Sequence, residues 1–170
     1  MKTATIGNAL GLILVALGLI MLAPVAVALL ALEFSAIPPF VVAAAASVGL
    51  GTLLRWRGGF SSDFDSLRRG EGMFIVCLAW VITGAIGAIP YLFFGLHPID
   101  AYFESISGFT TTGATILKDF TLYPKAFFFW RGLSHWRGGM GIIVLFVAIL
   151  PQFAVAGRQM FFAEAPGPTE

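Results

Sequence analysis

The chain has 170 residues, of which 58% are hydrophobic and only 11% are charged. A soluble domain usually carries about a quarter charged residues, so this composition argues against a soluble enzyme or a disordered tail and places the chain in a membrane. The formal charge of +1 argues against a nucleic-acid partner, which needs a clustered excess of basic residues, and the single cysteine, Cys77, excludes an internal disulfide framework.

Four runs without a charged residue divide the chain, and they are 30, 21, 28 and 20 residues long: Thr3–Leu32, Phe34–Leu54, Gly72–Ile99 and Gly138–Gly157. A helix needs about 20 apolar residues to cross the ~30 Å hydrocarbon core of a bilayer. Each run suffices for one crossing, so the sequence predicts four spanning helices. A cleaved signal peptide is the weaker alternative for the first run, because its apolar stretch is longer than the roughly 7–15 residues of a signal.

The basic residues predict the orientation. The short loop after the second run holds Arg55, Arg57, Arg68 and Arg69, whereas the connection between the first two runs holds only Glu33. The positive-inside rule therefore places this arginine-rich loop and the amino terminus in the cytoplasm, with the Glu33 turn outside.

The stretch between the third and fourth runs departs from the spanning pattern. Pro98 and Asp100 together indicate the start of a short helix. After two or three turns the segment Thr110–Thr115 follows, and its three consecutive threonines and Gly113 disfavour a continuing helix. A short helix that ends in a Thr/Gly segment is typical of a re-entrant loop, which is tolerated at membrane depth where it lines water or is buried in protein. An ordinary outer turn stays open as the alternative.

A re-entrant Thr/Gly segment suits a cation. Backbone carbonyls that point to one axis can replace the hydration shell of an ion, and Gly113 permits a positive φ that would cost an L-residue on the order of 1 kcal/mol. The helix before it directs its partially negative end into the membrane, which favours a cation. His97 and His135 lack a metal-ligand partner at suitable spacing, and the sequence predicts neither enzyme chemistry nor a cofactor.

The run Tyr102–Thr115 resembles the first pore loop of Trk-type potassium transporter membrane subunits. Further blocks agree with that family in order and distance: Phe129–Arg131, Trp136–Ile142, Ala148–Pro151 and Ala163–Pro168. The resemblance is specific over Tyr102–Pro168 and looser over the two amino-terminal helices.

The resemblance implies an all-α polytopic membrane protein with an amino-terminal helical hairpin and helix–pore loop–helix units, four of which surround a cation pore. The implied divisions are a hairpin (residues 1–58), a cytoplasmic loop (59–72), the first pore unit (73–157) and the start of a linker (158–170). The implied helices are the hairpin over Asn8–Leu54, then Met73–Gly95, the pore helix Pro98–Phe109 and Lys125–Val155. Only one Thr-Thr-Gly loop occurs, so the chain is expected to be the amino-terminal part of a longer protein and to supply one quarter of the pore.

By position, the resemblance makes Gly113 the filter glycine associated with potassium selectivity. Thr111, Thr112 and Ala114 would offer carbonyls beside it, with the potassium ion at Thr111, Thr112 and Gly113.

The roles of Glu104 and Gly138–Gly141 stay open, and an aromatic run has an ordinary structural interpretation. Glu104 lies inside the re-entrant helix, where an acid is costly unless wet or paired, so it either attracts cations in an outer vestibule or pairs with Arg131 or Lys125. Gly138–Gly141 permits a gating hinge or close helix packing. The aromatic run Phe127–Trp130 is expected to form an interfacial belt.

The resemblance also implies potassium passage through the bacterial inner membrane. The implied partners are membrane lipid, the rest of a longer chain, a homodimer mate and a cytosolic nucleotide-binding regulatory subunit. Two alternatives stay open: a homotetrameric cation channel in which four copies close the pore, and a non-transporting structural membrane protein.

Overall fold

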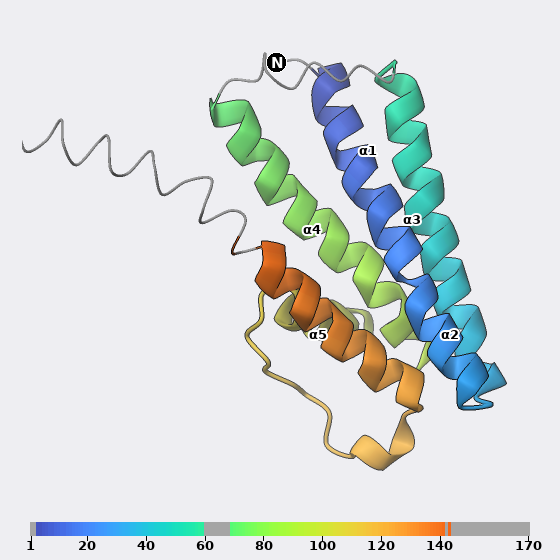
Figure 1. Ribbon diagram of the computed structural model, residues 1–170. Coiled ribbons are helices and arrows are strands. Elements are labelled where there is room, and N and C mark those ends of the chain that lie inside the picture. Colours follow the sequence, from blue (N-terminus) through green and yellow to red (C-terminus); the bar gives the residue numbers. More distant parts are fainter. Residues whose placement is uncertain (1–2, 60–68, 142, 144–170) are drawn as a thin grey trace, which may run out of the picture.

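A computed structural model describes residues 3–59, 69–141 and 143 of the chain, which form a bundle of helices (Figure 1). The helices in chain order are α1 (Thr3–Ile20), α2 (Leu22–Leu30), α3 (Ile37–Arg57), α4 (Arg69–Phe93) and α5 (Pro98–Phe109), with short 3-10 turns η1 (Phe34–Ala36) and η2 (Phe120–Leu122). A further helix covers residues 125–141. No strand occurs in these described ranges, and the predicted all-α class is confirmed.

Three helical stretches among the described residues are long and apolar enough to cross a membrane: Thr3–Leu30, Phe34–Arg57 and Gly70–Phe93. They correspond to the first three uncharged runs, so these three predicted spans are confirmed. Most of the fourth run, Gly138–Gly157, lies outside the described residues.

The first span contains a break that the sequence analysis did not predict. α1 ends at Ile20 and α2 begins at Leu22, with Met21 as a turn between them. Pro24 explains the break, because it has no N–H to donate to the Ile20 carbonyl and its ring crowds that carbonyl. The two helices still form one apolar stretch that is long enough to span.

α1 and α3 lie side by side and form the predicted hairpin (Figure 1). Gly11 and Gly51 face each other, and a Cβ on either glycine would press into the carbonyl oxygen of the other. The Ser47 hydroxyl donates a hydrogen bond to the Leu14 carbonyl at 2.7 Å across the same contact. Small residues thus allow the close backbone approach on which helix association in membranes depends.

α4 begins at Arg69, earlier than the expected Met73, and it ends at Phe93. Glu71 in the first turn favours the earlier start, because an acid stabilises the positive end of the helix dipole. The end is a Schellman motif: Gly95 has φ +88°, and the Leu96 N–H bonds to the Tyr91 carbonyl at 3.2 Å. The chain therefore turns sharply after α4 and enters α5 at Pro98.

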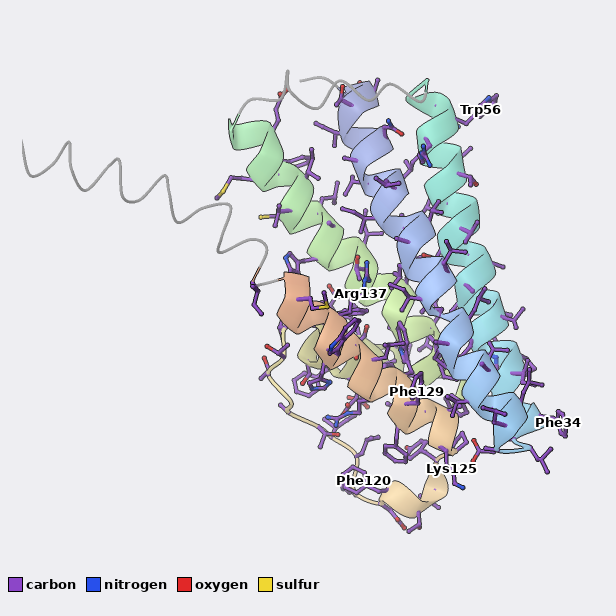
Figure 2. The ribbon with its side chains drawn as sticks, viewed as in Figure 1. Phe34, Trp56, Phe120, Lys125, Phe129 and Arg137 are labelled. Carbon is purple, nitrogen blue, oxygen red and sulfur yellow. The ribbon has the colours of Figure 1, made fainter. Side chains whose placement is uncertain are left out.

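The expected interfacial belt over Phe127–Trp130 is wrong for two of its four residues. Phe127 and Trp130 are fully buried. Phe129 is exposed, as Figure 2 shows. Residues three apart share a helix face, so Phe127 and Trp130 both pack into the core. Exposed aromatic side chains occur instead at opposite ends of the hairpin, at Phe34 and Trp56 (Figure 2), which is where interfacial aromatic residues are expected.

Glu33, in the turn of the hairpin, caps the helix over residues 125–141. Its carboxylate accepts hydrogen bonds from the Lys125 N–H at 3.0 Å and from the Ala126 N–H at 3.3 Å. The first N–H groups of a helix lack intrahelical partners and attract negative charge. This contact ties the hairpin to the segment that follows the re-entrant loop.

Candidate functional site

The chain leaves one end of the bundle where α4 ends, forms α5, and returns to the same end at η2. A shallow pocket at that end is lined by the hairpin turn (Ser35), the end of α4 (Phe93 and Phe94) and the region of η2 (Leu122). α5 starts directly after α4, the loop over residues 110–119 leads back to η2, and the helix over residues 125–141 then passes beside α5 (Figure 1). This is the path of a re-entrant loop, and the predicted helix Pro98–Phe109 is confirmed with the same bounds.

The end of α5 is also a Schellman motif, with a threonine where glycine is usual. The Thr112 N–H bonds to the Ser107 carbonyl at 3.1 Å, the Thr111 N–H bonds to the Gly108 carbonyl at 3.0 Å, and Thr111 has φ +59°. A β-branched residue in this left-handed region is a rare, strained conformation of order 1–3 kcal/mol. Gly113 has φ +76°, a conformation that glycine permits at little cost.

The four predicted filter residues are consecutive and exposed. Thr111, Thr112, Gly113 and Ala114 all lie at the surface of the described structure. The hydroxyls of Thr110 and Thr112 are 2.9 Å apart. Within the part of the chain that the structure describes, the carbonyls of Thr111 and Thr112 accept no hydrogen bond. Backbone and hydroxyl oxygens are thus concentrated in one exposed segment.

Close packing behind the loop holds it against the next helix. A Cβ on Gly138 would overlap the Phe109 carbonyl, and a Cβ on Gly108 would overlap the Ser134 hydroxyl. The geometry at Gly138 is that of close helix packing, and the hinge over Gly138–Gly141 stays a prediction.

The histidines stand apart from any metal centre. The His135 Nδ1 lies 2.7 Å from the Arg131 carbonyl in its own helix, and His97 occupies the position before α5 without a side-chain hydrogen bond to the helix. No cluster of three His, Cys, Asp or Glu residues that could hold a metal ion is found in the described ranges.

Glu104 lies beneath the loop and is fully buried. One carboxylate oxygen accepts hydrogen bonds from the Thr115 hydroxyl at 2.5 Å and the Ile116 N–H at 2.7 Å. The other accepts from the Arg131 Nε at 3.0 Å. The predicted pairing with Arg131 is confirmed, whereas Lys125 bonds to Glu33 through its backbone. A role of Glu104 in attracting cations stays a prediction.

Arg131 connects this carboxylate to the loop. Its Nη2 donates to the carbonyls of Gly113 and Ala114, both at 3.3 Å. The Ala114 carbonyl also accepts the Ser107 hydroxyl at 2.6 Å, so two donors within the chain engage it. The sequence predicts Arg131 only as a candidate partner of Glu104 and carries no signal for its contact with the two carbonyls.

Three apolar helices long enough to cross a membrane, followed by a short helix that returns the chain to the same end of the bundle, define a polytopic α-helical membrane protein. The model of the TrkH family, described as cation transport protein, matches residues 36–169. The chain belongs to this family.

Three relatives illustrate the match, and each is named Trk system potassium uptake protein TrkH. The protein from Escherichia coli K12 is 45% identical over 125 residues, which cover 72% of this chain and 26% of the relative. The Halomonas elongata protein is 40% identical over 162 residues, covering 94% and 33% respectively. The Vibrio parahaemolyticus protein is 38% identical over 173 residues, covering 100% and 35%. The chain thus spans about a quarter to a third of the length of these curated relatives.

Proposed function

We propose that the chain takes part in potassium uptake and that the segment Thr111–Ala114, here called the filter loop, supplies one quarter of a carbonyl-lined selectivity filter. The potassium ion faces the carbonyls of Thr111, Thr112 and Gly113. The observation that carries the proposal is the exposed filter loop at the end of α5, with Gly113 in the left-handed region, in a chain of the cation transport protein family.

Physical chemistry supports this assignment. A cation that gives up water needs oxygen ligands in its place, and a row of carbonyls and hydroxyls supplies them without a fixed charge that would trap the ion. The carbonyl end of α5 adds a partial negative charge next to the loop. Transport through such a filter makes and breaks no covalent bond.

One loop approaches the ion from one side only. The other sides would face lipid, where even an unsatisfied polar group costs several kcal/mol. Three more loops must therefore complete the path. The relatives named for potassium uptake are about three to four times as long as the matched segment, which favours further units of a longer protein over four identical copies of this chain.

The proposal also covers the membrane in which the protein lies, its orientation there and its partners. The proposed place is a bacterial inner membrane with the end of α3 on the cytoplasmic side, and the arginine residues Arg55 and Arg57 in the last turn of α3 support this orientation. The name of the relatives refers to a Trk system, and the proposed partners are a second copy of the transporter and a cytosolic nucleotide-binding regulatory subunit.

Growth at limiting potassium tests the function. The complete open reading frame that contains these residues is expressed in cells that lack their own potassium uptake systems. We expect rescue of growth by the complete reading frame and no rescue by residues 1–170 alone. Failure of the complete frame, at normal abundance in the membrane, would contradict the proposal. Rescue by residues 1–170, with a tetramer in mild detergent, would instead establish a homotetrameric channel.

A further inference from the structure

We propose that Glu104 and Arg131 form a charge-neutral brace that orients the carbonyls of Gly113 and Ala114 and thereby sets the cation affinity and selectivity of the filter loop. This inference rests on the proposed function and assigns two positioning residues to it.

The brace joins the end of the filter loop and the residues directly after it to two helices. Glu104 comes from the middle of α5, and it holds the segment after the filter loop through Thr115 and Ile116. Arg131 comes from the helix over residues 125–141 and reaches the carbonyls of Gly113 and Ala114. Four of the five hydrogen bonds in this network act on residues 113–116, so the network fixes the peptide groups that follow the left-handed Gly113.

The guanidinium is suited to this task because it is planar and presents several donors in a fixed fork. Its Nε binds the carboxylate while its Nη2 reaches the two carbonyls. A lysine at this position would keep the charge but would concentrate its donors on one nitrogen. It could not hold the carboxylate and both carbonyls in the same geometry.

Charge neutrality matters because a cation must approach the same carbonyls. An unpaired guanidinium beside them would repel it, and at a few ångströms this repulsion is weakly screened in a protein environment. Glu104 is fully buried and lies 3.0 Å from the Arg131 Nε, whose side chain is only 18% exposed. Arg131 thus donates hydrogen bonds to the loop while the pair presents no net positive charge to the ion.

The experiment uses the complete reading frame in cells without their own potassium uptake. Initial rates of potassium and sodium uptake are measured against concentration and divided by the amount of transporter in the membrane. The variants are Glu104→Gln, Arg131→Lys and the double variant Glu104→Gln with Arg131→Met. Asp100→Asn, on the same helix, and Lys118→Gln, in the exposed loop, are matched controls that remove a charge outside the brace.

We expect Glu104→Gln to raise the potassium KM about tenfold, because it leaves the Arg131 charge unneutralised next to the ion. The double variant removes both charges, so its KM returns to within about threefold of the wild type if charge is the cause. The ratio of potassium to sodium uptake falls in the double variant and in Arg131→Lys, because the carbonyls of Gly113 and Ala114 lose their hydrogen-bond donors. Both controls keep the wild-type KM and ratio.

A merely structural pair would lower the amount of transporter in the membrane and leave KM and the ion ratio unchanged. If Glu104→Gln and Arg131→Lys keep the wild-type KM and ion ratio while the wild type takes up potassium, the proposed brace is wrong and the proposed function still holds. If Glu104→Gln fails to reach the membrane, an unchanged ion ratio in Arg131→Lys and in the double variant would contradict the brace instead. A wild type that takes up no potassium would reject the proposed function itself.

Discussion

Ser105 and Ser107 of α5 are both buried, but only one of the two hydroxyls makes a hydrogen bond within the described part of the chain. The Ser107 hydroxyl donates to the Ala114 carbonyl at 2.6 Å. The Ser105 hydroxyl is buried and has no hydrogen-bond partner among the described residues. Loss of a net favourable hydrogen bond costs about 1 kcal/mol, whereas removal of an unsatisfied buried hydroxyl is neutral or stabilising.

We therefore expect Ser107→Ala to lower the midpoint of thermal unfolding of the purified protein in detergent, and Ser105→Ala to leave it unchanged or raise it. Both substitutions change helix propensity equally, so each serves as the control for the other. Equal shifts of the two midpoints would contradict the described hydrogen bond to the filter loop.

At the scale of residues, the sequence predicts what local chemistry dictates. An acid inside a re-entrant helix needs a partner, and Arg131 was one of two candidates for Glu104. The positive φ of Gly113 followed from its residue type. The positive φ of Thr111 did not, because three consecutive threonines favour extended backbone and only the Schellman motif at the end of α5 imposes the turn. The contact of Glu33 with Lys125 joins residues 92 positions apart and left no local signal.

Among the elements, the contact between α5 and the helix over residues 125–141 is closest at Gly138. A Cβ on Gly138 would overlap the Phe109 carbonyl, whereas a Cβ on Gly141 would meet no atom of the described residues within 4 Å. Overpacking at a fixed backbone contact costs about 1–3 kcal/mol, and Gly to Ala in an open helical position is favourable by roughly 0.5–1 kcal/mol.

We expect Gly138→Ala to reduce both the unfolding midpoint and the uptake rate per transporter, because it pushes the end of α5 away from the helix behind it. Gly141→Ala is the matched control and should leave both quantities at or above the wild-type value. A Gly138→Ala protein as stable and active as Gly141→Ala would show that the two helices are not in close contact there.

Helix bounds were predictable where the sequence carries a stop or start signal. Pro98 and the threonine run gave the bounds of α5 without error. The break at Met21 was missed because the apolar run continues through it, and only the lost hydrogen bond at Pro24 reveals it. The aromatic belt was wrong at Phe127 and Trp130 because composition alone does not tell which face of a helix packs inward.

For the whole molecule, the uncharged runs predicted the three spans of the described residues, since lipid permits few ways to cross it. Their orientation in the membrane leads to a labelling experiment. In a Cys77→Ala background, a cysteine in place of Ser62, which lies outside the described residues, should react with an impermeant thiol reagent only from the cytoplasm. A cysteine in place of His97, before α5, should react only from outside. Reaction of both positions from the same side would contradict the proposed topology.

The central claim is that Gly113 forms part of a potassium-selective path. The ratio of potassium to sodium uptake tests this claim most directly. Gly113 and Gly95 both have positive φ, +76° and +88°, but only Gly113 lies in the filter loop. In the complete reading frame we expect Gly113→Ser to lower the ratio about tenfold, which corresponds to ~1.4 kcal/mol of lost discrimination. Gly113→Asp should lower it further by adding a fixed charge, whereas Gly95→Ser, with the same backbone strain, should keep the wild-type ratio. Ratios equal to the wild type in both Gly113 variants would contradict the assignment of the filter loop.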